Sequence, residues 1–186
     1  MLNGKVRNLA ITGIAIASAL GLTTALGAAP ALASSPSYKL IVNSGETALD
    51  VTANGAGKPV TISNSGTDDN WVFVNTQNWS DPFGQVVQVS EIQHAGTNNC
   101  INNSSGVFVI SGCTAGDSDE LFYGLPTGST TNGNPNYWYI NEAATDAAGH
   151  YVFMTAASYT NGADVLAEEG GQGGLAAWNR KCSANC

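Results

Sequence analysis

The sequence has little charge, and most of that charge is negative. Only 11% of its 186 residues are charged, well below the roughly 25% of an ordinary soluble protein. Six residues are lysine or arginine against 14 aspartates and glutamates, so the formal net charge is −8. Binding to nucleic acid or to an anionic membrane by charge needs a basic face. This composition excludes nucleic acid as a partner and argues against adhesion to a membrane.

Residues that perform chemistry at neutral pH are scarce. The two histidines, His94 and His150, both stand near glycine in turn-like settings, so we expect them on the surface. No Gly-x-Ser-x-Gly nucleophile elbow is present. A zinc site needs a close pair of ligands on both sides, and Cys100 and Cys113 do not have that spacing. We therefore expect no metal, no cofactor and no catalytic activity. The alternative is a secreted enzyme that cleaves glycans, because two of the 14 acidic residues could form the carboxylate pair that such enzymes use.

The N-terminus has the features of a secretory signal peptide. Two basic residues precede an uncharged stretch of Ala, Leu, Ile, Gly and Thr at 9–29, and Ala31-Leu32-Ala33 has the small-x-small pattern of a cleavage site. We expect residues 1–33 to be removed and 34–186 to be exported as one domain, free of the membrane. With four basic and 14 acidic residues left, its net charge would be −10. The alternative is a transmembrane anchor, since the stretch approaches the length of a span.

Export favours disulfide bonds, and four cysteines follow the signal peptide. Three connectivities are possible. Nearness in sequence favours Cys100–Cys113 and Cys182–Cys186. The first bond would close a loop of about 14 residues, which stabilises a fold by about 3 kcal/mol in the chain-entropy model.

Short apolar runs separated by Gly, Asn, Ser and Asp predict β-strands throughout the chain. They fall into three sets of four. The twelve runs are Tyr38–Asn43, Ala48–Thr52, Pro59–Ser63, Trp71–Asn75, Val86–Gln93, Cys100–Asn103, Val107–Ser111, Leu121–Gly124, Tyr137–Asn141, Tyr151–Thr155, Asp164–Ala167 and Ala176–Arg180.

Equivalent positions of the three sets recur about every 50 residues. The second strands are centred on Asp50, Asn102 and Phe153. One set cannot bury its own apolar face, so we expect three to close on one another in an all-β fold. A β-sandwich with accidental spacing is the alternative. Aromatic residues that mark the repeats are expected in the core: Trp71, Phe73, Phe122, Tyr139 and Trp178.

This organisation resembles a β-trefoil, and more narrowly the ricin-type β-trefoil lectin domain. Tyr38–Asn43 followed by Ala48–Val51 matches the opening of a family repeat. Cys100-Ile101-Asn102 and then Cys113 are similar to the family's Cys-Leu-Asp and its second cysteine. The resemblance covers about residues 38–181 and implies one β-trefoil domain. Its repeats would span about 38–83, 84–134 and 135–182.

The resemblance also implies carbohydrate binding in shallow pockets, up to one per repeat. In the family, an Asp of the second strand accepts hydrogen bonds from sugar hydroxyls, and an aromatic of the third strand stacks on the ring. Here only the first repeat keeps the acid of the second strand, as Asp50. The same repeat has Asp69 at its terminal motif, with Asp68 beside it. In the second repeat, Asn102 stands where the family has the acid. These four residues are therefore the expected carbohydrate-binding set.

We thus expect a secreted lectin-like module without catalytic activity, whose working site is in the first repeat. That repeat lacks its stacking aromatic, and Trp79 or Phe83 in the following connection could supply a ring. The alternative function is a protein-binding β-trefoil, such as a secreted protease inhibitor. Such a protein would use the polar segment 124–136 as a recognition loop. Nothing in the sequence specifies an oligomeric interface.

Overall fold

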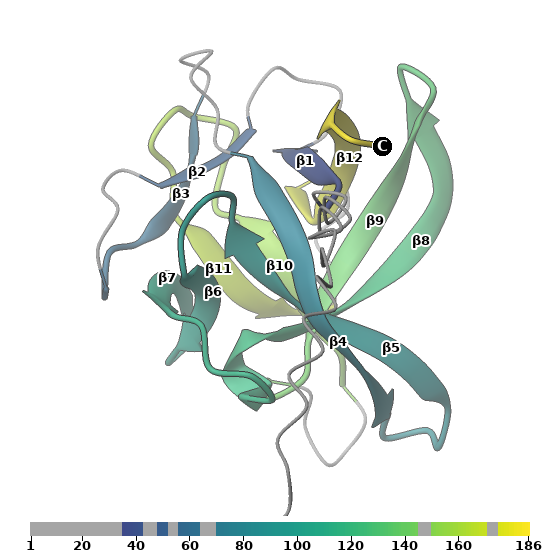
Figure 1. The fold of residues 1–186 in the computed structure, drawn as a ribbon. Coiled ribbons are helices and arrows are strands. Elements are labelled where there is room, and N and C mark those ends of the chain that lie inside the picture. Colours follow the sequence, from purple (N-terminus) through teal and green to yellow (C-terminus); the bar gives the residue numbers. More distant parts are fainter. Residues whose placement is uncertain (1–34, 43–47, 52–55, 64–69, 145–149, 171–174) are drawn as a thin grey trace, which may run out of the picture. The chain divides into compact units, whose positions relative to one another are not determined.

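Twelve β-strands and one short 3-10 helix make up the part of the chain that the computed structural model describes (Figure 1). The described residues are 35–42, 48–51, 56–63, 70–144, 150–170 and 175–186, all within the unit Ser34–Cys186. None of them belongs to a helix long and apolar enough to cross a membrane. The predicted signal peptide lies outside this range.

Six of the strands form a closed antiparallel barrel. They are β1 (Ser37–Val42), β4 (Trp71–Ser80), β5 (Val86–His94), β8 (Leu121–Thr131), β9 (Asn134–Asn141) and β12 (Ala177–Ala184). Each pairs with two others in the ring order β1, β4, β5, β8, β9, β12 and back to β1. Closure leaves the barrel without an exposed edge strand.

The other six strands form three hairpins that gather on one side of the barrel (Figure 1). They are β2 (Ala48–Val51) with β3 (Val60–Ser63), β6 (Asn99–Ser104) with β7 (Val107–Gly112), and β10 (Val152–Ala156) with β11 (Val165–Glu169). Single bridges join each hairpin to the next: Leu166 to Val107, Pro59 to Val109, and Thr61 to Asp164. Each of the twelve predicted runs overlaps one of these strands, so the all-β prediction is confirmed.

Aromatic residues from equivalent positions of the three repeats fill the core. Trp71, Phe122 and Trp178 lie at the starts of β4, β8 and β12, and none is more than 2% exposed. The indole Nε1–H of Trp178 donates to the buried backbone carbonyl of Met154 at 2.7 Å. Tyr139 is buried with them, and Phe73 packs against the cluster. The core positions expected for the repeating aromatics are therefore confirmed.

Two local expectations are wrong. His94 is not on the surface: it is the last residue of β5, is 8% exposed, and packs edge-on against Trp71 with ring centroids 5.5 Å apart. The segment 124–136 is not a loop, because most of it forms the hairpin β8–β9. Its turn is Asn132-Gly133, with positive φ at both residues, which suits the twist of a two-residue hairpin. The polar composition of this segment predicted a loop. An exposed hairpin has the same composition because it buries few apolar side chains.

Both favoured disulfides are present. Cys100 bonds to Cys113 and joins the ends of the hairpin β6–β7. Cys182 bonds to Cys186 at the C-terminus. The favoured connectivity is confirmed.

Candidate functional site

The structure describes two of the four predicted sugar-contacting residues, and it places them on different hairpins. Asp50 lies in the middle of β2, opposite Thr61 of β3. Asp68 and Asp69 lie outside the described residues. Asn102 belongs to a different hairpin, where it stands opposite Val109. The first-repeat site therefore stays a prediction.

In the second repeat, Asn102 faces a buried carboxylate. Its amide Nδ2 lies 3.5 Å from Oε1 of Glu120, the last residue of the 3-10 helix η1 (Ser118–Glu120). Glu120 is fully buried, and its Oε2 accepts a hydrogen bond from the backbone N–H of Thr114 at 2.7 Å. Burial raises the pKa of the Glu120 carboxyl, and the hydrogen bonds from Thr114 and Asn102 oppose that rise.

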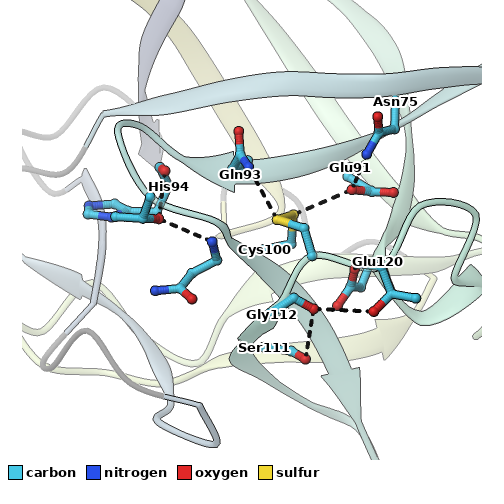
Figure 2. Close-up of a disulfide and its surroundings, with 12 residues drawn as sticks. Asn75, Glu91, Gln93, His94, Cys100, Ser111, Gly112 and Glu120 are labelled. Atoms are coloured by element: carbon cyan, nitrogen blue, oxygen red, sulfur yellow. Dashed lines mark hydrogen bonds between the residues drawn. A yellow bond between two sulfur atoms is a disulfide. The ribbon is translucent and has the colours of Figure 1, made fainter.

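A second buried carboxylate, that of Glu91, lies close to the Cys100–Cys113 disulfide (Figure 2). Glu91 on β5 accepts hydrogen bonds from Asn75 Nδ2 at 2.8 Å and from the backbone N–H of Gly116 at 3.3 Å. Its Oε2 lies 3.6 Å from Sγ of Cys100. Glu91, Cys100 and Cys113 are close enough to suggest a metal site, but bonded sulfurs supply no thiolate ligands. The second repeat therefore uses this region for a buried polar network.

In the third repeat, the equivalent position lies beside a cavity. Phe153 stands in the middle of β10, where the first repeat has Asp50 on β2. A cavity of about 520 Å³ is lined by His150, Tyr151, Phe153, Glu169 and Gly170. Glu169 is exposed at the end of β11. We call this cavity the third-repeat pocket; it places two aromatic rings and one carboxylate around the same space.

Edge-to-face contacts hold the rings of the third-repeat pocket in place. Tyr151 and Phe153 have centroids 6.5 Å apart and planes at 83°. Trp138 of β9 meets Phe153 at 6.2 Å and 79°. Phe83, which is 60% exposed, meets Tyr151 at 5.3 Å and 71°. Aromatic pairs favour this geometry, so an exposed ring from the β4–β5 connection packs on one of the rings that line the pocket.

A hydrogen bond between distant segments fixes the position of Tyr151. Its hydroxyl donates to Oδ2 of Asp81 at 2.6 Å, while Oδ1 of Asp81 accepts backbone N–H groups of Phe83 and Gln85. The bond from Tyr151 is the main cause that lowers the pKa of Asp81. Burial, followed by the bond to Asp81, raises the pKa of Tyr151 to about 12. At neutral pH the phenol is therefore protonated and bonded to Asp81, and its ring remains as an apolar surface.

No family model and no curated protein matches the sequence. Solved structures do. A designed 3-fold symmetric protein, ThreeFoil, is 16% identical with a TM-score of 0.56, over 78% of this chain and 97% of that chain. The Haemophilus ducreyi cytolethal distending toxin is 14% identical with a TM-score of 0.59, over 86% and 90%. A mosquitocidal holotoxin is 12% identical with a TM-score of 0.59, over 80% of this chain and 17% of that chain.

The fold is a β-trefoil. The closed six-stranded barrel, the three hairpins and these likenesses agree on it. The resemblance to the ricin-type β-trefoil domain is thereby confirmed at the level of the fold. Identities this low carry no information on ligands.

Sequence reasoning missed the third-repeat pocket of this β-trefoil because Phe153 stands where the family has an acid. It did single out Phe83 as a ring for the first repeat, but the structure places that ring against Tyr151 of the third. Trp79 instead pairs with Val87 within the β4–β5 hairpin. The available signal was the gathering of aromatic residues in 137–153, which falls in the repeat that lost its acid.

Proposed function

We propose that this protein is a secreted, non-catalytic carbohydrate-binding module whose glycan site is the third-repeat pocket. One observation carries the proposal: the rings of Tyr151 and Phe153 line the same cavity as the carboxylate of Glu169. A sugar presents C–H groups on one face and hydroxyls at its edge. An aromatic ring packs against the first, and a carboxylate accepts hydrogen bonds from the second.

In the proposed complex the three parts of the pocket have different roles. The rings of Tyr151 and Phe153 cover the apolar face of one sugar. The oxygens of Glu169 accept hydrogen bonds from neighbouring hydroxyls. Phe83 extends the ring surface toward a second sugar along the chain. A single exposed pocket of this kind binds weakly, so strong attachment would come from several copies acting together.

The other parts of the proposal rest on separate observations. Secretion rests on the apolar stretch at 9–29 and its small-x-small ending. The lack of catalysis rests on the acids near the pocket. Glycoside hydrolysis needs two carboxylates on opposite sides of the bond, roughly 5–9.5 Å apart. Among the described residues that line the pocket, Glu169 is the one acid.

Expression of the full-length chain followed by glycan-array binding tests the proposal. N-terminal sequencing of protein from the medium should begin at Ser34. Phe153→Ala and Glu169→Gln should each weaken glycan binding by at least about tenfold, the loss of a ring contact or a charged hydrogen bond. Glu168→Gln is the matched control, since it changes a neighbouring carboxylate that does not line the pocket.

Each other outcome has a defined meaning. Binding lost in Asp50→Ala but kept in Phe153→Ala would move the site to the first repeat. An array on which the folded wild-type protein binds no glycan would refute the carbohydrate-binding proposal. Sugar release from any bound glycan would refute the non-catalytic part.

A further inference from the structure

A second cavity lies between the barrel hairpins β4–β5 and β8–β9. Its volume is about 550 Å³, within the range of roughly 300–1,000 Å³ typical of small-molecule sites. Its described lining mixes polar side chains with the apolar Phe73, Val87 and Pro126, and Arg180 of β12 contributes the one positive charge. None of its described lining residues belongs to the third-repeat pocket.

The guanidinium of Arg180 is held by aromatic rings. Its central carbon lies 4.0 Å from the ring centroid of Phe73 and 4.3 Å from that of Tyr137. Two further rings, Tyr38 and Tyr139, lie within 5.6 Å. Its Nε–H donates to the hydroxyl of Tyr139 at 2.9 Å. Ring faces attract a cation, and a planar guanidinium stacks well on them, so this charge is positioned before any ligand arrives.

Glycine at position 124 leaves room for this arrangement. A Cβ at Gly124 would lie 3.3 Å from Nη2 of Arg180 and 3.3 Å from the ring of Tyr139. Such a Cβ would crowd both the guanidinium and the ring of Tyr139. The sequence thus keeps space for the Nη groups at the cavity wall.

Arg180 has no carboxylate partner among the residues that the structure describes. Among the described residues its polar partner is Tyr139, and that bond uses one of the five N–H donors of a guanidinium. The described lining of the cavity contains hydroxyls and an amide, at Thr76, Gln88 and Ser90, but no acid. In a chain of net charge −8, a preorganised guanidinium that lines a cavity without an acidic neighbour favours an anionic ligand.

We propose that this Arg180 cavity binds a small monoanion made of a carboxylate on an apolar ring. The carboxylate accepts two parallel hydrogen bonds from the guanidinium, the geometry that arginine suits best. The ring of the ligand packs against the apolar part of the lining, at Val87 and Pro126. The negative charge of the whole chain disfavours ligands that carry several negative charges. This site is separate from the proposed glycan site and does not depend on it.

Benzoate and benzamide are matched probes, because they share a ring and a planar head group and differ in charge. Titration of the full-length expressed protein by NMR should show saturable benzoate binding, with amide shifts at Gly124 and Ser90. Benzoate should bind at least about tenfold more tightly than benzamide, the range expected for hydrogen bonds to a charged group. Arg180→Gln should remove that preference.

Lys181→Gln is the control for net charge. Lys181 is exposed and adjacent on β12, where successive side chains point to opposite faces, so its loss should leave benzoate binding unchanged. Arg180→Lys is the second variant, for use if Arg180→Gln does not fold. It keeps the charge but loses the two parallel N–H donors of the guanidinium, so it should weaken benzoate binding several-fold. Phe153→Ala should have no effect, which separates this site from the glycan site.

Three results would overturn the proposal. One is equal affinity of the wild-type protein for benzoate and benzamide. Another is an equal loss of benzoate binding in Lys181→Gln and Arg180→Gln, because the effect would then be net charge alone. The third is a set of benzoate-induced shifts that avoids the residues lining the cavity.

Discussion

In the second repeat, β6 places Asn102 beside the buried Glu120 and near a disulfide, whereas in the third repeat β10 places Phe153 on the wall of a cavity. The two hairpins have the same place in the threefold fold. Their difference shows that the scaffold sets where a side chain stands, while the neighbouring segments decide whether that place is filled or open. In the second repeat the neighbours are a 3-10 helix and a cystine; in the third they are rings.

The largest expected effect concerns the disulfide of the second repeat. Cys100→Ser with Cys113→Ser should lower the free energy of unfolding by about 3 kcal/mol, because a loop of about 14 residues is released in the unfolded chain. Urea unfolding measures it. The same change at Cys182 and Cys186 frees a loop of about five residues and should cost about 2 kcal/mol. A larger cost at the C-terminal pair would contradict the dependence on loop length that underlies both values.

The next largest effect on stability concerns Trp178, the core tryptophan of the third repeat. Trp178→Phe installs the residue type that the second repeat has at Phe122. It should cost about 2 kcal/mol, because it removes ring volume and leaves the buried carbonyl of Met154 without its donor. Thermal and urea unfolding give the value. Phe122→Leu removes ring volume without a hydrogen bond and should cost about 1 kcal/mol; equal costs would show that the Trp178 bond contributes nothing.

A smaller effect concerns the pH dependence of the second-repeat network. Because burial raises the pKa of Glu120 in the folded protein, its protonated form is the one that folding favours. That contribution is fully present below the unfolded pKa of about 4.5 and is lost as the pH rises through the folded pKa. Glu120→Gln should therefore gain stability relative to the wild type between pH 4 and pH 7. Unfolding free energies at several pH values test it, and a gain that shrinks with rising pH would contradict it.

The smallest expected effect on stability is the most direct test of the comparison. Phe153→Asn gives the third repeat the residue of the second. Phe153 is only partly buried, so the unfolding free energy should fall by less than about 1 kcal/mol. Truncation of a fully buried core residue costs more than this. Glycan binding should nevertheless fall by at least about tenfold, because the ring is lost. Array binding and thermal unfolding of the same sample measure both.

The converse change restores the family's acid in the second repeat. Asn102→Asp should create no glycan binding, because it puts a second carboxylate beside Glu120 in a region already filled. A gain of glycan binding in this variant would contradict the view that the neighbouring segments close this place.

Much of the fold could be predicted because its causes are local. Alternating apolar residues and glycine turns mark strands, and cysteines close in sequence paired as nearness favoured. His94 could not be placed this way. It stands next to turn residues, and only the pairing of β5 with β4 shows that it packs on Trp71. Segment 124–136 failed for a related reason, because strand pairing satisfies its backbone whatever its polarity.

The candidate sites were harder to predict because their parts come from distant segments. Tyr151 is fixed by Asp81, 70 residues away. Arg180 stacks on rings from three other strands, and no motif surrounds it in the sequence. The family pattern predicted sites around acids in the second strands, whereas the described lining of both cavities includes aromatic rings from other positions.

By itself, the sequence determined the number of strands, their threefold order, the favoured cystine pairs and the aromatic core. These follow from hydrophobic period and turn chemistry, which act over a few residues. Only the tertiary structure decided which equivalent positions stay open. Barrel closure brings four rings to Arg180, and packing of the β4–β5 connection against the third repeat brings Phe83 to Tyr151. Whether a side chain faces a cavity or a buried network depends on neighbours that the chain supplies only after it has folded.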